Sequence, residues 1–289
     1  MGQETAPEIS VVVPLYNEEE NVEAFHAELT ASLEQLGRSF EVVLVDDGSA
    51  GAESQALLEG LRPEFARRGW TLERQANRYL GAARNAAARI ARGEYLLFAD
   101  DDNVHLPHAI STLVRAALRT GADVVTDLMD LFGGAEPPRP PPRARALFLG
   151  AAPAVGAFRN CFGDASALWR RETFFALGGF SEDVGLGYED WELFARAVLR
   201  GARLELVPEP LHWYRVGEGS MLRSAPAFAS HMRRLRPYLE AVPDALRDVV
   251  LLAHGLAARR ERTEAERRRE APRQEGDDLA PWERDGAAG

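Results

Sequence analysis

Short apolar runs of strand length alternate with helical stripes along the first half of the chain. Residues 9–14 and 40–45 are rich in β-branched and aliphatic side chains, and they end at Pro14 and before Asp46. Such runs are typical of buried parallel strands. The range 19–36 between them carries apolar residues at spacings of three and four, which predicts a helix packed on a sheet.

The same alternation continues to about residue 126. It predicts helices over 52–68, 80–91 and 106–119, and strands over 70–75, 95–99 and 122–126. A repeated strand–helix order is typical of the α/β class. We therefore expect an open, mostly parallel, doubly wound sheet with helices on both faces.

A proline-rich segment separates this half from the next. Five prolines fall within 133–145, which predicts a loop without regular structure. Beyond it, the pattern predicts a strand over 165–169, helices over 171–177 and 190–200, and two short strands near Leu204 and Trp213. Helical patterns return at 226–239 and from 243 onward. The range 259–289 is rich in charge and poor in apolar residues, so we expect a solvated helix that frays into a disordered tail.

The composition excludes several classes of protein. All 34 basic residues are arginine, so a P-loop, a protein kinase site and a lysine Schiff base are excluded. The single cysteine, Cys161, excludes a disulfide within the chain and a cysteine-rich zinc site. A net charge of −11 argues against nucleic acid as a partner.

No apolar run in the sequence is long enough for a transmembrane segment, and the N-terminus lacks the pattern of a signal peptide. The expected location is cytoplasmic, and peripheral association with a membrane stays open.

Polar side chains follow the predicted strands at their carboxyl ends, which meet at one edge of an open sheet. Taken singly, such residues also serve as helix caps. Three adjacent aspartates, however, repel one another unless a cation compensates them, and carboxylates suit Mg²⁺ or Mn²⁺. The pattern favours a metal-bridged phosphate ester as ligand. The strand-end residues are Leu15, Tyr16, Asn17, Asp46, Asp47, Asn77, Arg78, Asp100, Asp101 and Asp102.

The absence of the required glycine motif excludes a dinucleotide-binding site of the Rossmann type. Such a site requires a glycine fingerprint after the first strand, where this chain has the sequence YNEEEN at 16–21.

Six segments together resemble the family 2 glycosyltransferases. They are VVVPLYNEEENV, VVLVDDGS, NRYLGAARN, GEYLLFADDDN, ALGGFSED and GYEDWELFARAVLRG, in the family's order and covering about residues 8–223. The resemblance implies a GT-A fold, a nucleotide-sugar donor such as a UDP-sugar, a Mn²⁺ or Mg²⁺ ion, and inversion at the anomeric carbon.

The resemblance also implies residue roles on the donor side. Asp47 faces the nucleotide base, and Asp100 lies towards the ribose with Asp101 at a variable place beside it. Asp102 binds the metal ion. The family often has a further metal-binding histidine just after a tyrosine–arginine pair, here Tyr214-Arg215. This chain lacks a histidine there, and His212 is the candidate to replace it. Further donor contacts are implied for Leu15, Tyr16, Asn17, Asn77, Arg78 and Arg84.

On the acceptor side, the resemblance makes Asp190 the general base, with Glu189 supporting it or contacting the acceptor. Asp164 and Trp191 are implied acceptor contacts. From the residues alone, either carboxylate of the Glu189–Asp190 pair also suits a helix N-terminus, and Trp191 also suits a core.

The expected organisation is one domain over 1–225, with C-terminal helices over 226–258 and the charged tail beyond. Within the domain, a nucleotide-binding half spans about 8–130 and an acceptor half about 146–225. The expected activity is metal-dependent, inverting transfer of a hexosyl group to a hydroxyl acceptor on a glycan, lipid, peptide or small molecule. A retaining transferase, a nucleotidyltransferase and a non-catalytic sugar-binding or scaffold module stay open as alternatives.

Overall fold

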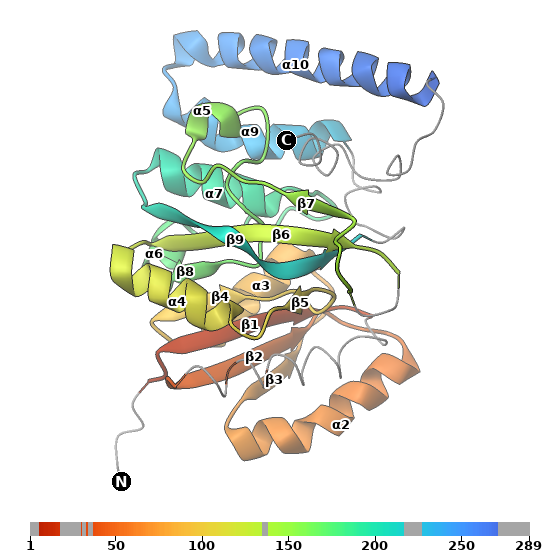
Figure 1. The fold of residues 1–289 in the computed structure, drawn as a ribbon, viewed down its shortest axis with the longest axis vertical. Coiled ribbons are helices and arrows are strands. Elements are labelled where there is room, and N and C mark those ends of the chain that lie inside the picture. Colours follow the sequence, from red (N-terminus) through yellow and green to blue (C-terminus); the bar gives the residue numbers. More distant parts are fainter. Residues whose placement is uncertain are drawn as a thin grey trace.

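The computed structural model describes residues 6–17, 30, 33, 37–134, 138–216 and 227–270. Figure 1 shows their arrangement. The strands are β1 (Ile9–Leu15), β2 (Phe40–Asp46), β3 (Thr71–Arg74), β4 (Tyr95–Phe98), β5 (Val104–His105), β6 (Val124–Phe132), β7 (Ala144–Ala146), β8 (Leu168–Arg170) and β9 (Leu204–Arg215). The helices are α2 (Ala52–Arg68), α3 (Tyr79–Ile90), α4 (Ala109–Thr120), α5 (Pro153–Gly156), α6 (Arg171–Ala176), α7 (Glu189–Leu199), α9 (Ala227–Ala241) and α10 (Asp244–Glu270).

The strands form one sheet in the order β3-β2-β1-β4-β8-β6-β9-β5, and β7 pairs with β6. Pairing is parallel from β3 through β2 and β1 to β4. Beyond β4 the sheet becomes mixed, because β8 is antiparallel to both of its neighbours while β6 and β9 are parallel. The predicted α/β fold is confirmed, with parallel pairing concentrated in the N-terminal half.

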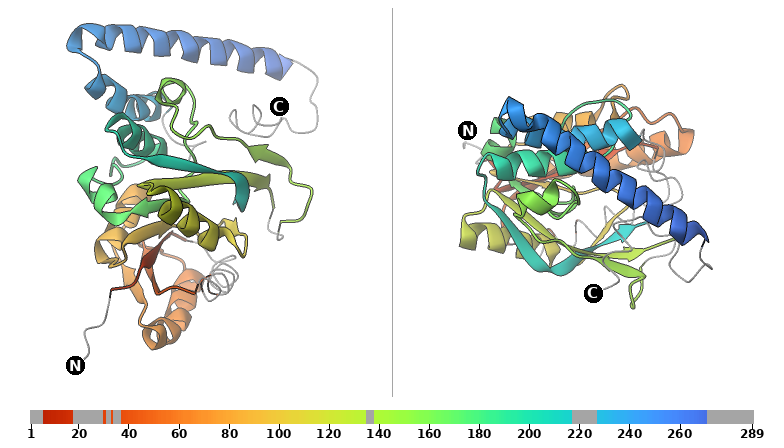
Figure 2. Two further views of the ribbon diagram at one scale, coloured as in Figure 1. Left: turned by 60° about the vertical axis from the view of Figure 1, so that its left-hand side comes forward. Right: turned by 90° about the horizontal axis from the view of Figure 1, so that it is seen from above.

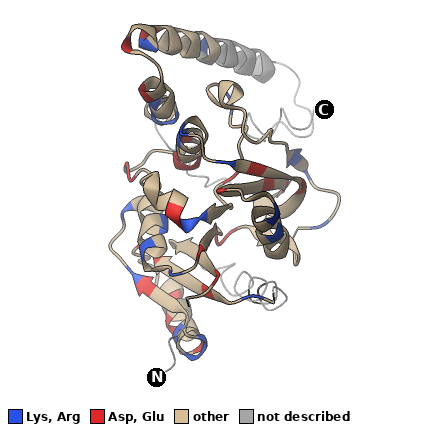
Figure 3. Cartoon of the chain, turned by 90° about the vertical axis from the view of Figure 1, so that its left-hand side faces the viewer, with Lys and Arg blue, Asp and Glu red and all other residues tan. Residues whose placement is uncertain are grey.

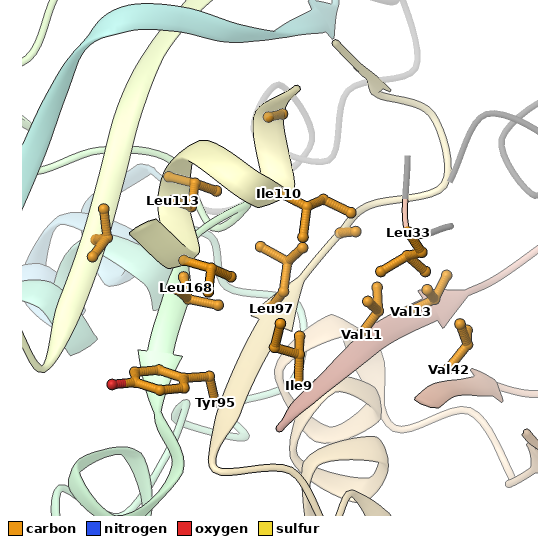
Figure 4. Packing of buried hydrophobic residues seen from close by; sticks show 14 of the residues in the cluster. Ile9, Val11, Val13, Leu33, Val42, Tyr95, Leu97, Ile110, Leu113 and Leu168 are labelled. Atoms are coloured by element: carbon orange, nitrogen blue, oxygen red, sulfur yellow. The ribbon is translucent and has the colours of Figure 1, made fainter. Parts of the chain in front are cut away.

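Alternation along β1 sends its side chains to two separate cores. Ile9, Val11 and Val13 enter the core that α2 and α4 cover. Figure 4 shows them in one layer with Leu97 of β4 and Ile110 of α4. Strand β1 is therefore buried on both faces, as a sheet covered by helices on both sides requires.

The opposite face of the sheet packs against α3, α6, α7 and α9. Val12 of β1 lies in this second core together with Leu235 and Tyr238 of α9. Helix α9 is thus packed into the main domain, although the sequence placed its range outside 1–225. Figure 2 shows α10 crossing above α9 at the periphery. Among the described helices, none combines the length and the apolar character that crossing a bilayer requires.

Two strands of the second half differ from the predicted elements. The two short strands expected near Leu204 and Trp213 are one strand, because β9 passes its two prolines through a shift of register against β6. Ala144 and Arg145 of the expected proline-rich loop belong to β7. Residues 259–270 continue α10 as helix, in agreement with the helix expected at the start of the charged segment.

Other predictions fall outside the described residues. Of the helix predicted over 19–36, the structure describes Thr30 and Leu33, which are both helical. The range 271–289 of the predicted tail is likewise outside the described residues.

A buried carboxylate, that of Glu41, links the N-terminal ends of β1 and β2 to the segment before β4 through hydrogen bonds. Glu41 is 4% exposed; Ser10 Oγ donates to its Oε1 at 2.7 Å, and the Arg92 backbone N–H donates to the same atom at 2.6 Å. Ser10 Oγ in turn accepts from the Gly93 N–H at 2.8 Å. This network links three segments at the amino end of the sheet, opposite the edge with the strand-end aspartates.

Replacing Glu41 by alanine should lower the free energy of unfolding by about 2–4 kcal/mol, because it leaves buried donors unpaired. Urea denaturation followed by circular dichroism measures this loss. Glu8→Ala is the matched control, since its ion pair with Arg38 is solvent-accessible and should cost less than about 1 kcal/mol. Equal losses in the two variants would contradict a structural role for the Glu41 network.

Candidate active site

The loops after β1 and β2 are joined at the carboxyl edge of the sheet. The Asn17 N–H donates to Ser49 Oγ at 2.8 Å, and Asn17 Oδ1 accepts from the Ala50 N–H at 2.9 Å. Asn17 has a φ of 52°, a left-handed conformation that asparagine tolerates better than most residues. Leu15 is buried beneath this junction, and Tyr16 is 53% exposed beside it.

Asp47 organises the segment that leads into α3. Its Oδ1 accepts from Gln75 Nε2 at 2.7 Å and from the Arg78 N–H at 2.9 Å, and the residue is 3% exposed. Gly48 beside it has a φ of +83°, and a Cβ there would lie 2.8 Å from the Asn77 nitrogen. This close approach requires glycine. The contacts place Asp47, Asn77 and Arg78 at one point of the edge.

Arg84 connects the two halves of the site. Its Nη2 donates to both oxygens of Asp100 at 2.7 and 2.8 Å, and its Nη1 donates to Glu189 Oε1 at 2.9 Å. Arg84 lies on α3 and is 1% exposed. It therefore binds the loop after β4 to the start of α7, and its guanidinium faces protein carboxylates rather than solvent.

Burial opposes the charge of Arg84 and would by itself lower its pKa. The carboxylates of Asp100 and Glu189 outweigh burial and hold the pKa above its ordinary value. A fully buried arginine with two acidic partners is a permanent cation. It partly neutralises an otherwise strongly acidic region.

Asp190 and Asp164 form the acidic part of the site opposite Asp100. Burial, then the charges of Glu189 and Asp164, raise the pKa of Asp190 to about 8. Burial also raises the pKa of Asp164, with Asp100 adding to the shift and His212 opposing it. Burial raises the pKa of Tyr214, and nearby carboxylates, those of Asp164 and Asp102 foremost, add to it. Acidic segments occur on strands as well as helices in Figure 3.

His212 lies beneath Asp164 in a buried hydrogen-bonded pair. Its Nδ1 is 2.9 Å from Asp127 Oδ2, and its Nε2 is 3.8 Å from Asp164 Oδ1. Burial alone would lower its pKa, but Asp127 and Asp164 raise it to about 9. The Asp127 carboxylate fixes the orientation of the imidazole and leaves Nε2 turned towards Asp164. The metal-ligand role that the sequence suggested for His212 stays a prediction.

Asp102 lies in the turn after β4, where the Asn103 N–H donates to the Asp100 carbonyl at 3.3 Å. The Asp102 carbonyl oxygen accepts from Arg215 Nε at 3.2 Å, and its side chain is partly exposed at the edge. Among the described residues, no three His, Cys, Asp or Glu side chains come together as a ready metal-ligand set. A partly exposed carboxylate is chemically suited to bind Mg²⁺ or Mn²⁺, and both ions complete their coordination with other oxygen ligands.

Trp191 lies inside the described fold. It is 4% exposed, and its Nε1 donates to the Gly156 carbonyl at 2.7 Å. Arg234 lies over its indole ring at 4.0 Å. This environment favours the core interpretation of Trp191 over stacking on a sugar.

Sequence reasoning missed two residues of the site, Asp127 and Tyr214. Asp127 lies within β6 and is 2% exposed. A carboxylate inside an otherwise apolar strand is a readable signal, because a buried charge requires a partner. The partner, His212, is 85 residues away. The tyrosine–arginine pair marks Tyr214 in the sequence but assigns no role to its side chain.

Family models match most of this region. Residues 10–181 match the model described as "Glycosyl transferase family 2", and residues 145–254 match "Glycosyltransferase like family 2". The first model alone covers more than half of the chain. The chain belongs to glycosyltransferase family 2.

Two curated relatives share parts of the sequence. The undecaprenyl-phosphate 4-deoxy-4-formamido-L-arabinose transferase of Aeromonas hydrophila is 35% identical over 118 residues, which are 40% of this chain and 35% of that protein. The succinoglycan biosynthesis protein ExoO of Rhizobium meliloti is 29% identical over 228 residues, 75% of this chain and 63% of that protein. The match thus spans about a third of the first relative and less than two thirds of the second.

Two solved structures share the fold. TarS 1–349 of S. aureus, in complex with UDP-GlcNAc, has a TM-score of 0.62 at 21% identity and covers 86% of this chain and 71% of that one. The mannosyltransferase PcManGT of Pyrobaculum calidifontis, in complex with GDP-Man and Mn²⁺, has a TM-score of 0.56 at 18% identity and covers 94% and 77%. The predicted GT-A fold is confirmed.

Asp190→Asn should stabilise the protein at high pH. A carboxyl group whose pKa rises from 3.8 to about 8 on folding contributes stability fully below pH 3.8, and that contribution is lost as the pH rises towards 8. At pH 9 the variant avoids a buried, repelled charge, so we expect a melting temperature about 2–8 °C above wild type, corresponding to about 1–2 kcal/mol.

At pH 5 the difference should be smaller, because the carboxyl is protonated in the folded protein and only its ionisation in the unfolded chain has begun to count. Differential scanning calorimetry at both pH values measures this. Asp248→Asn on the exposed surface of α10 is the control and should show no pH-dependent gain. A destabilised Asp190→Asn at pH 9 would contradict the electrostatic account of the site.

Proposed function

We propose that this chain is an inverting glycosyltransferase that moves a sugar from a nucleotide-sugar donor to an acceptor. The observation that carries the proposal is the position of Asp190. It lies at the start of α7, beside Asp164, with a pKa of about 8. A carboxylate of raised pKa accepts a proton more readily than an ordinary one, which suits deprotonation of an acceptor hydroxyl.

The donor is proposed to lie along the edge formed by the loops after β1, β2 and β4. Asp47 would face the base, with Leu15, Tyr16 and Asn17 framing it, and Asn77 and Arg78 would lie over the nucleotide. The ordered junction of these loops supports this, because it presents a preformed surface. UDP-GlcNAc and GDP-Man occur in the two structural neighbours, and we favour a UDP-sugar.

Arg84 and Glu189 have supporting roles in this proposal. Arg84 holds Asp100 in place for the ribose, and its pairing with Glu189 fixes the residue next to Asp190. Both side chains are buried, so their effect on the donor and the acceptor is exerted through Asp100 and Asp190. Asp101 beside them has no separate role in the proposal.

Asp102 would hold a divalent cation, Mn²⁺ or Mg²⁺. Such an ion neutralises negative charge that develops on a departing diphosphate. The neighbour with GDP-Man also contains Mn²⁺, and a single partly exposed carboxylate leaves positions for phosphate oxygens.

The acceptor is proposed to approach Asp190 from the side of Asp164. The Aeromonas relative is named for an undecaprenyl-phosphate acceptor and the Rhizobium relative for succinoglycan biosynthesis. We favour a growing glycan over a peptide or a small molecule. A lipid phosphate is the less favoured acceptor, because its phosphate oxygens are already ionised near neutral pH and need no base. Action at the cytoplasmic face of a membrane is part of this proposal.

Asp190→Asn should lower kcat about 10²- to 10⁴-fold, because the amide cannot accept the proton. The dissociation constant of the nucleotide should change less than about twofold. For wild type, kcat/KM should rise with pH through about 8, since only the ionised carboxylate is active. Measurements are initial rates across pH, calorimetry with UDP, and NMR of the product's anomeric centre. Near-normal transfer by the variant, or retention of configuration, would contradict the proposal.

Asp102→Ala should remove the dependence of donor binding on Mn²⁺. In wild type we expect Mn²⁺ to tighten UDP binding at least about tenfold, and in the variant titrations with and without Mn²⁺ should give the same affinity. Asp101→Ala is the matched control, because it removes the adjacent carboxylate and should keep the metal effect. A metal effect that survives in Asp102→Ala and disappears in Asp101→Ala would reassign the ligand.

A further inference from the structure

Four residues of helix α9, Ser230, His231, Arg233 and Arg234, contact the segment that precedes Asp190. Ser230 Oγ accepts from the Gly187 N–H at 3.2 Å. The ring of His231 lies 5.8 Å from that of Tyr188, and the Arg234 guanidinium lies 5.5 Å from the same ring. Arg233, between them, makes the most extensive set of these contacts.

The guanidinium of Arg233 binds the backbone of the loop before α7. Its Nη1 donates to the carbonyls of Leu186 at 2.7 Å and Gly187 at 3.2 Å, and its Nη2 donates to the carbonyl of Asp183 at 2.8 Å. Its Nε donates to the carboxylate of Asp183 at 3.4 Å. All three nitrogens of the planar fork are therefore used, and the residue is 1% exposed.

The same arginine also lies near the carboxylate next to Asp190. Arg233 Nη1 is 3.6 Å from Glu189 Oε2, while Arg84 holds Glu189 Oε1 at 2.9 Å. Glu189 is thus held between a cation from α3 and a cation from α9. These two contacts fix the Glu189 side chain at the first position of α7.

The backbone at this point is strained. Tyr188 precedes α7 with a φ of 66°, a left-handed conformation that is unfavourable for an aromatic residue. Such conformations persist only where the surroundings hold them in place. The contacts from α9 provide that restraint immediately before Glu189 and Asp190.

We propose that Arg233 is a positioning residue for glycosyl transfer, which holds the 183–187 loop so that Asp190 faces the acceptor. This inference rests on the proposed function. In this proposal α9 positions the general base, although none of the proposed donor contacts comes from α9. Because a displacement of about 1 Å in a reacting group is enough to cost about 10²-fold in rate, loss of this arginine should affect turnover more than donor binding.

The test compares Arg233→Met with Arg236→Met. Arg236 lies one turn further along α9 and pairs with the carboxylate of Asp183 at 2.7 Å, but its side chain is 43% exposed. The Arg236→Met variant therefore removes one positive charge from the same helix and leaves the buried guanidinium of Arg233 in place. Circular dichroism and melting curves identify any variant that fails to fold.

We expect Arg233→Met to lower kcat for donor hydrolysis and transfer about 10- to 100-fold, with the UDP dissociation constant within about twofold of wild type. Amide hydrogen exchange over 184–192 should become at least about tenfold faster. Arg236→Met should leave all three quantities near wild type. Arg233→Lys keeps the charge but loses the fork, so its kcat should remain at least about fivefold below wild type.

The outcomes separate this inference from the proposed function. A wild-type protein without turnover on any nucleotide sugar would contradict the proposed function, while the exchange data would still test the restraint by Arg233. An active wild type with the two Met variants alike in kcat and exchange would overturn the inference. Full recovery of kcat by Arg233→Lys would also overturn it, because charge alone would then suffice.

Discussion

The buried ion pairs of Arg84 are the interaction on which the rest of the site depends. One guanidinium joins Asp100, at the end of β4, to Glu189, at the start of α7. Because the pairs are almost fully desolvated, removal of either partner would leave an uncompensated charge in the interior. The two halves of the domain therefore meet at a fixed distance, and the surfaces proposed for donor and acceptor are set by it.

The single charge of Arg84 does not balance the acidic groups around it. Asp164 and Asp190 both have raised pKa values, burial being the largest cause, and the neighbouring carboxylates of Asp127 and Asp164 raise the pKa of His212 despite its burial. Such an arrangement is unfavourable for stability and favourable for chemistry, because groups of perturbed pKa are those able to exchange protons near neutral pH. The backbone of Tyr188, with a φ of 66°, is likewise unfavourable for stability, and such strain is common at functional sites.

The differences between the predicted and observed elements have physical causes. Prolines 208 and 210 predict an interruption between two short strands, yet β9 continues through them because a bulge absorbs the missing donors. Trp191 fits both a core and a sugar site by sequence, and burial beside Gly156 and Arg234 favours the core. In both cases the deciding contact comes from an element distant in the chain.

The sequence by itself determined the order of strands and helices, the residues at the strand ends and the family, because periodicity and short motifs are local properties. Helix α2, for example, has the predicted bounds of Ala52–Arg68. Only the tertiary structure decided which charges meet. Arg84 and Glu189 are 105 residues apart in the chain, and Arg233 reaches Asp183 across 50 residues. No local pattern encodes such pairings, since they follow from how the helices pack on the sheet.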